Sequence, residues 1–168
     1  MTINTILFDV FGTVFDMSSI PQEEIRDYVR HVKSEEWSPL VLPESWGELK
    51  AHPDSREGIE RLSKRFEVVT FSNGPIELLR HISESNDNDI AWDSFVPVAH
   101  TRGYKPATWV YPWACGWLNK PPASVMMVTA NATFGDLEGA AACGMVPQLV
   151  RHEGCPMTLI ELAERLGC

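Results

Sequence analysis

The chain has 168 residues, of which 44% are hydrophobic and 22% are charged, and its formal net charge is −9 at pH 7. This length favours one domain with a real core, and the composition excludes a wholly disordered chain. The acidic balance argues against general nucleic-acid binding, which needs clustered Lys and Arg, and no apolar run is long enough to cross a membrane.

The N-terminal residues lack a basic region ahead of an apolar stretch, so we expect no secretory signal and a cytoplasmic location. The four cysteines show no Cys-x-x-Cys spacing, so neither a zinc site nor a redox dithiol is predicted. We expect them to stay reduced. They are Cys115, Cys143, Cys155 and Cys168.

Short β-branched runs and segments with helical spacing alternate along most of the chain. This alternation predicts an α/β fold, a single Rossmann-like domain over 1–168 with a parallel sheet of about five strands and helices on both faces. In chain order we predict a strand at 5–9, helices at 22–33 and 54–64, a strand at 66–72, a helix at 75–83, a strand at 94–100, a helix at 107–118, a strand at 125–130, a helix at 135–143, a strand at 148–152 and a helix at 158–166.

The segment 16–65 between the first two strands interrupts this alternation. It contains the helix 22–33, an irregular aromatic stretch, and the helix 54–64 with Asp54 as its expected N-cap. We interpret 16–65 as a small cap or lid inserted into the domain; the alternative is an ordinary long crossover. Arg26 and Arg30 lie on the polar face of the first helix, where solvated surface charges are expected.

Polar side chains follow four of the predicted strands. Ligands of parallel sheets bind beyond the carboxyl ends of the strands, so we expect these groups to converge on one crevice. Each is weak evidence alone, since an Asp after a strand often caps a turn and a lone Lys is usually solvated. They are Asp9, Ser72, Asn73, Lys105, Thr129, Asn131 and Asp136.

Four ordered motifs make the chain similar to the haloacid dehalogenase superfamily, and within it to the 2-haloacid dehalogenase branch. The resemblance covers nearly the whole chain apart from the cap, and it implies the strand order 3-2-1-4-5. The motifs are Phe8-Asp9-Val10-Phe11-Gly12-Thr13-Val14-Phe15-Asp16, then Ser72-Asn73-Gly74, then Tyr104-Lys105-Pro106 with Tyr111, and finally Val128-Thr129-Ala130-Asn131 with Asp136-Leu137-Glu138-Gly139.

The resemblance implies that Asp9 is a nucleophile that forms a covalent ester, which water then hydrolyses. Lys105 would hold Asp9 ionised and oriented. Thr13 and Ser72 would hydrogen-bond the carboxylate or the substrate. Asp136 would orient Lys105 and a water. Gly12 would permit the tight turn after the first strand, and the substrate would be contacted by Phe11, Asn73, Tyr111, Thr129 and Asn131.

Phe11 decides between two chemistries. Superfamily phosphatases resemble one another in having an Asp at this position as general acid for the leaving alcohol, whereas a halide leaves without a proton. The sequence therefore favours a hydrolase of small 2-haloacids that needs no cofactor. One alternative is a Mg²⁺-dependent phosphatase with Asp9, Asp136 and the backbone carbonyl of Phe11 as metal ligands, and another is a degenerate protein that binds a ligand or partner without turnover.

Two departures from the family pattern bear on this hypothesis. The cap is much shorter than the family's, which supplies an arginine for the departing halide, and the loop 132–135 is longer and could displace Asp136. Separately, Trp109, Trp113 and Trp117 share one helix face, which is typical of core or of a subunit interface. An exposed stripe would predict a homodimer. We expect a small-molecule substrate as partner, and no nucleic acid or membrane.

Overall fold

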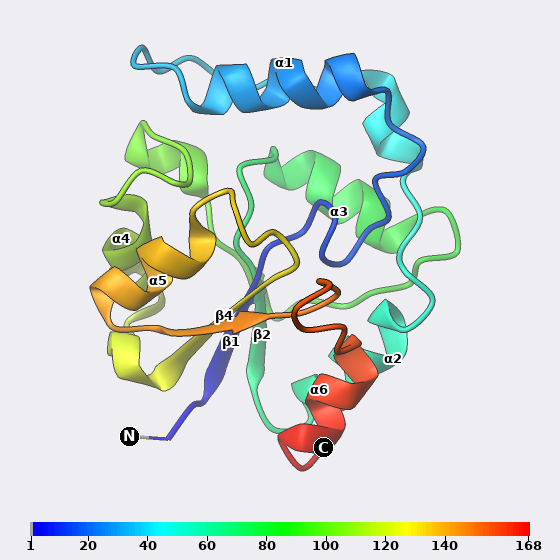
Figure 1. Cartoon of the computed structure of the whole chain (residues 1–168), viewed down its shortest axis with the longest axis vertical. Helices are drawn as coiled ribbons and strands as arrows, with labels where there is room; N and C mark the ends of the chain where they lie inside the picture. Colours follow the sequence, from blue (N-terminus) through cyan, green and yellow to red (C-terminus); the bar gives the residue numbers. More distant parts are fainter. Residues whose placement is uncertain (1) are drawn as a thin grey trace.

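A fully parallel sheet forms the centre of the protein, which a computed structural model describes over residues 2–168. Its strand order is β3-β2-β1-β4-β5, as the resemblance implied. The predicted α/β fold is confirmed (Figure 1). The strands are β1 (Thr5–Phe8), β2 (Glu67–Thr70), β3 (Ser94–Phe95), β4 (Val125–Thr129) and β5 (Val146–Leu149).

Helices cover both faces of this sheet. The α-helices are α1 (Gln22–Val32), α2 (Ser55–Ser63), α3 (Ile76–Glu84), α4 (Val110–Leu118), α5 (Asp136–Cys143) and α6 (Leu159–Arg165). Short 3₁₀ helices are η1 (Glu44–Glu48), η2 (Val98–Thr101) and η3 (Pro122–Ser124). No helix in residues 2–168 has the length and apolar character needed to cross a bilayer.

Alternating side chains of the strands build two separate cores, because successive residues of a strand point to opposite faces. Ile6 and Phe8 of β1 belong to the core beneath α2, α3 and α6. Leu7 between them belongs to the core beneath α4 and α5. The central strands are therefore apolar throughout, as is typical of a parallel sheet covered on both sides.

Two predicted strands differ from the structure. The third was expected over 94–100 but pairs with β2 through Ser94 and Phe95 alone, and η2 begins just after Pro97. The fifth was expected over 148–152 but runs from Val146 to Leu149. Pro147 is tolerated within it because β5 is an edge strand.

The segment 16–65 divides into two parts with different neighbours. Helix α2 packs side by side with α6 and also contacts β2, at the opposite end of the molecule from α1 (Figure 1). Helix α1 and the following stretch lie beyond the strand ends instead, where a lid would lie. Val32 at the end of α1 joins the core beneath α4 and α5.

Asp54 occupies the N-cap position of α2, as predicted, but its side chain does not cap the helix. One carboxylate oxygen accepts a 2.7 Å bond from the backbone N–H of Leu159, the first residue of α6. Both oxygens also receive a two-pronged ion pair from Arg151, at 2.7 and 3.0 Å. Asp54 therefore links α6 and the segment that follows β5 to the start of α2.

The tryptophan face of α4 is only partly covered. Trp109 is 56% exposed and Trp117 is 44% exposed, whereas Trp113 is half-buried. A homodimer through this face remains a prediction.

Candidate active site

Asp9 follows β1, and two hydroxyl groups fix its carboxylate. Its Oδ2 accepts a 3.0 Å bond from Thr13 Oγ1 and a 3.1 Å bond from Thr129 Oγ1, which lies at the end of the neighbouring strand β4. Gly12 has φ +84°, so the tight turn that brings Thr13 back to Asp9 uses a conformation that glycine adopts freely. The Asp9 side chain keeps 17% of its surface exposed.

Lys105 lies between two carboxylates. Its Nζ is 3.2 Å from Asp9 Oδ1 and 3.1 Å from Asp136 Oδ2, and its side chain is 1% exposed. Burial acts to lower the pKa of Lys105, but the charges of Asp136 and Asp9 outweigh burial and raise this pKa above its usual value. The ammonium therefore stays charged and holds both carboxylates in place.

Asp136 begins α5 and is completely buried. Its Oδ1 accepts a 2.7 Å bond from the Tyr111 hydroxyl on α4, so both of its oxygens have partners. Burial raises the pKa of Asp136 although Lys105 acts in the opposite direction. A carboxylate with a raised pKa that shares an ammonium with the candidate nucleophile is a candidate to accept a proton from water.

The side chain of Asn73 positions Lys105 by bonding to the Lys105 backbone. Its Oδ1 accepts a 2.7 Å bond from the Lys105 N–H, and its Nδ2 donates a 2.9 Å bond to the Lys105 carbonyl. The same Nδ2 donates at 3.2 Å to the hydroxyl of Tyr28 on α1. Ser72 has a local role, because its Oγ accepts from the N–H of Gly74 at 3.1 Å.

Tyr28 is a site residue that the sequence reasoning missed. The sequence placed it only within the helix predicted over 22–33. The only feature of the sequence that could have indicated a role in the site is that Tyr28 carries a phenol and lies in the short insert between the first two strands. That feature could not show that Tyr28 meets Asn73, from which it is separated by 45 positions.

The longer loop before α5 does not displace Asp136 from Lys105. Asn131 Oδ1 accepts bonds from the N–H groups of Thr133 and Phe134, both at 3.0 Å, and so folds the loop into a compact turn. Asn131 itself is exposed, and its side-chain oxygen serves the loop. The expectation that it contacts the substrate stays a prediction.

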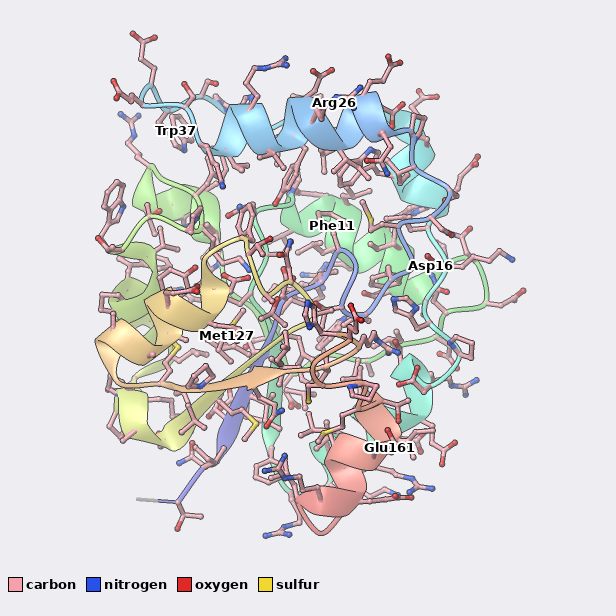
Figure 2. All side chains as sticks on the ribbon, viewed as in Figure 1. Phe11, Asp16, Arg26, Trp37, Met127 and Glu161 are labelled. Atoms are coloured by element: carbon pink, nitrogen blue, oxygen red, sulfur yellow. The ribbon has the colours of Figure 1, made fainter. Side chains whose placement is uncertain are left out.

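An open cavity of about 440 Å³ lies between α1 and the loops that follow β1 and β4. Three aromatic rings form much of its wall, with Phe11 edge-on to Trp46 at 4.9 Å and to Tyr28 at 6.3 Å. Figure 2 shows Phe11 in the space below α1. Phe11 follows Asp9 by two positions in the chain, so the wall of the cavity includes the loop that also carries the candidate nucleophile.

Neither arginine of α1 faces this cavity. Arg26 and Arg30 are exposed, and Arg30 pairs with Asp27 on the same helix. Arg151 lines the cavity, but its guanidinium is bound to Asp54 and donates a 2.7 Å bond to the Thr13 carbonyl. The arginine that the resemblance implies for the cap has no counterpart on α1.

The two carboxylates among the candidate Mg²⁺ ligands, Asp9 and Asp136, are both paired with Lys105. Within residues 2–168 no cluster of three His, Cys, Asp or Glu side chains has the arrangement of a metal site. The Lys105 ammonium lies between Asp9 and Asp136, where a cation bridging both carboxylates would have to be. A Mg²⁺ ion bound by both carboxylates would therefore compete with this ammonium, and the phosphatase alternative stays a prediction.

Comparison with known proteins gives consistent matches, although no family model matches the chain. (S)-2-haloacid dehalogenase 4A of Burkholderia cepacia is 33% identical over 116 residues, which are 68% of this chain and 49% of that protein. (S)-2-haloacid dehalogenase 1 of Pseudomonas sp. (strain CBS-3) is 34% identical over 104 residues, which are 61% of this chain and 45% of that protein. The matched segments thus span about half the length of these curated relatives.

Comparison with solved structures also finds haloacid dehalogenases. The structure of L-2-haloacid dehalogenase from Xanthobacter autotrophicus with chloropropionic acid covalently bound superposes with a TM-score of 0.71 and 19% identity, covering 98% of this chain and 82% of the other. The sequence matches and the shared fold agree with the ordered motifs around Asp9, Lys105 and Asp136. The chain belongs to the haloacid dehalogenase superfamily, in its 2-haloacid dehalogenase-like branch.

Proposed function

We propose that the protein is a hydrolase that removes the halide from 2-haloacids through a covalent ester on Asp9, without a metal. The observation that carries the proposal is the ion cluster of Asp9, Lys105 and Asp136, together with a largely apolar cavity lined by Phe11 of the loop that follows Asp9. The curated relatives named as (S)-2-haloacid dehalogenases support it.

In the first step a carboxylate oxygen of Asp9 attacks C2 of the acid as the carbon–halogen bond breaks and the halide leaves with the bonding pair. Lys105 and the hydroxyls of Thr13 and Thr129 hold the carboxylate in one orientation. Such positioning reduces the entropic cost of bringing nucleophile and carbon together. Phe11 suits this step, because a halide needs no proton from the position that it occupies.

In the second step water adds to the carboxyl carbon of the Asp9 ester, and the 2-hydroxy acid leaves with the ester oxygen. Asp136 is the candidate to accept the water's proton, which then passes to the departing alkoxide. Its raised pKa and its bond to Tyr111 suit this role. Across both steps, acid and water yield hydroxy acid, halide and one proton.

The cavity is the candidate site for the side chain of the acid. The aromatic wall of the cavity presents mainly apolar atoms to a ligand, because the Trp46 indole N–H already donates to Glu24 at 3.0 Å. Cavities of roughly 300–1,000 Å³ typically hold ligands with many heavy atoms. We therefore propose that acids with extended apolar side chains fit as well as short ones.

Halide release from a panel of 2-haloacids, with and without EDTA, tests the proposal. We expect release that EDTA does not abolish and that disappears in Asp9→Asn. Asp16→Asn changes the exposed acid at the end of the same motif and should retain release. Mass spectrometry of the protein during turnover should detect a transient ester on Asp9. Mg²⁺-dependent hydrolysis of phosphate esters without halide release would overturn the proposal in favour of a phosphatase, and neither activity would favour a binding protein.

A further inference from the structure

A leaving halide gathers negative charge, and in a site that excludes water this charge needs hydrogen-bond donors. The positive side chains near the site are already engaged. Lys105 is bound by two carboxylates, Arg151 is paired with Asp54, and the arginines of α1 are exposed. Lys33, at the end of α1, lies over the Phe134 ring at the rim of the cavity and is exposed.

Tyr28 is the donor that α1 directs toward the site. It lines the cavity with Phe11, and its oxygen accepts a 3.2 Å bond from Asn73 Nδ2, the amide that also holds Lys105. Because its oxygen serves as acceptor in that bond, the phenol proton remains free to donate. Burial, followed by the charge of Asp9, raises the pKa of Tyr28, so the phenol keeps its proton.

We propose that the Tyr28 hydroxyl donates a hydrogen bond to the departing halide, since no arginine of α1 faces the cavity. This inference rests on the proposed dehalogenation. Tyr28 transfers no proton in this step. The carbon–halogen bond breaks as Asp9 forms the ester, the halide takes the electron pair, and the O–H group stabilises the resulting anion. The Asn73 amide, by holding the phenol oxygen, orients the donor and increases its polarity.

Tyr28→Phe removes the hydroxyl and keeps the ring. Removing one preorganised donor to a developing negative charge costs about 10²–10³-fold in kcat. A small halide concentrates its charge and accepts hydrogen bonds more strongly than a large one. We therefore expect kcat of Tyr28→Phe to fall about 100-fold with a 2-chloro acid and about tenfold with the matching 2-iodo acid.

Tyr104→Phe is the matched control, because the Tyr104 hydroxyl donates to the Ser38 carbonyl at 2.6 Å, away from the cluster. We expect this control and Lys33→Met to leave the chloride-to-iodide rate ratio unchanged. A purely structural defect in Tyr28→Phe would lower the rates for all halides by the same factor. Single-turnover halide release should slow in Tyr28→Phe, while hydrolysis of the Asp9 ester keeps its rate.

The possible outcomes separate the two proposals. Asp9-dependent halide release by the wild type together with an unchanged rate ratio in Tyr28→Phe would overturn the role of Tyr28 and leave the proposed function standing. A changed ratio in Lys33→Met instead would assign the halide to that ammonium and also overturn the role of Tyr28. Absence of halide release by the wild type would overturn the proposed function itself.

Discussion

Gly139 on α5 lies directly against the ring of Tyr111 on α4, so closely that a methyl group at this glycine would overlap the ring. The contact fixes the distance between the two helices that hold the Tyr111–Asp136 hydrogen bond. The absence of a side chain at position 139 is therefore a condition for the geometry of the candidate site.

Gly139→Ala should consequently lower both stability and halide release. Overpacking of a tight core typically costs about 1–3 kcal/mol, and displacement of Tyr111 would also loosen Asp136. Gly116→Ala is the matched control on α4, where an added methyl group meets nothing within 4 Å. Urea unfolding should show a gain of up to about 1 kcal/mol for the control. Equal stabilities of the two variants would contradict the tight contact.

Lys105→Met should be strongly destabilising at neutral pH, because it leaves two carboxylates without their shared cation. Breaking a buried ion pair by removing one partner costs about 3–5 kcal/mol. The loss should shrink at acid pH, where Asp136, whose pKa is raised, takes up a proton. Lys120→Met removes a surface pair with Glu67 and should cost less than about 1 kcal/mol. Urea unfolding of both variants at pH 5 and pH 7.5 checks the sign.

The wild-type cluster has its own pH dependence at the alkaline end. The folded protein raises the pKa of Lys105, so the stabilisation from this ammonium is complete below the ordinary lysine pKa and is lost as pH rises through the higher folded value. Between neutral and alkaline pH, we expect the unfolding free energy of wild type, relative to Lys105→Met, to begin to decline only when the pH exceeds the ordinary lysine pKa. A decline near neutral pH would contradict a charged Lys105.

Arg151→Met should destabilise the protein by about 3 kcal/mol at neutral pH, since Asp54 would lose its partner in a largely buried position. Burial acts to raise the pKa of Asp54, but the Arg151 and Leu159 bonds outweigh it and lower this pKa below its usual value. The stabilisation is thus present above the ordinary Asp pKa and is lost as pH falls through the lower folded value. Arg56→Met, which breaks an exposed pair with Asp89, is the control and should change little.

The cavity beneath α1 predicts a dependence of catalytic efficiency on substrate length. Each buried methylene contributes about 0.8 kcal/mol, so kcat/KM should rise up to about fourfold per methylene along a series of linear 2-bromo acids. Ile25→Trp would fill the cavity and should flatten this series. Val41→Trp adds the same ring at a position that is 86% exposed and should not. If kcat/KM of wild type did not change along the series, the side chain of the substrate acid would lie outside the cavity.

The sequence predicted the sheet well because the central strands are apolar throughout and separated by clear helical patterns. Asp9, Lys105 and Asp136 were predictable as a cluster because parallel strands bring their carboxyl ends to one edge. Two strands are shorter than predicted at their C-terminal ends, because local backbone geometry ends them earlier. Pro97 precedes η2, and Arg151, with φ +51°, lies beyond the end of β5 although the predicted strand included it.

Long-range side-chain bonds could not be read from local patterns. Asp54 has the sequence position of a cap for α2, but its carboxylate binds Arg151 and the N–H of Leu159, which are about 100 positions away. Tyr28 likewise fits the apolar face of an amphipathic helix, and only the folded chain brings it to Asn73. In both cases a distant partner determines the role of the residue.

The Arg151 guanidinium connects the loop of the candidate nucleophile to the C-terminal part of the chain. One nitrogen holds the Thr13 carbonyl, and the others hold the Asp54 carboxylate, which in turn holds the first turn of α6. The nucleophile loop and the C-terminal helix are thus parts of one cooperative unit. Heat that detaches the helix also releases the loop, so thermal inactivation and global unfolding should follow a single curve with one midpoint.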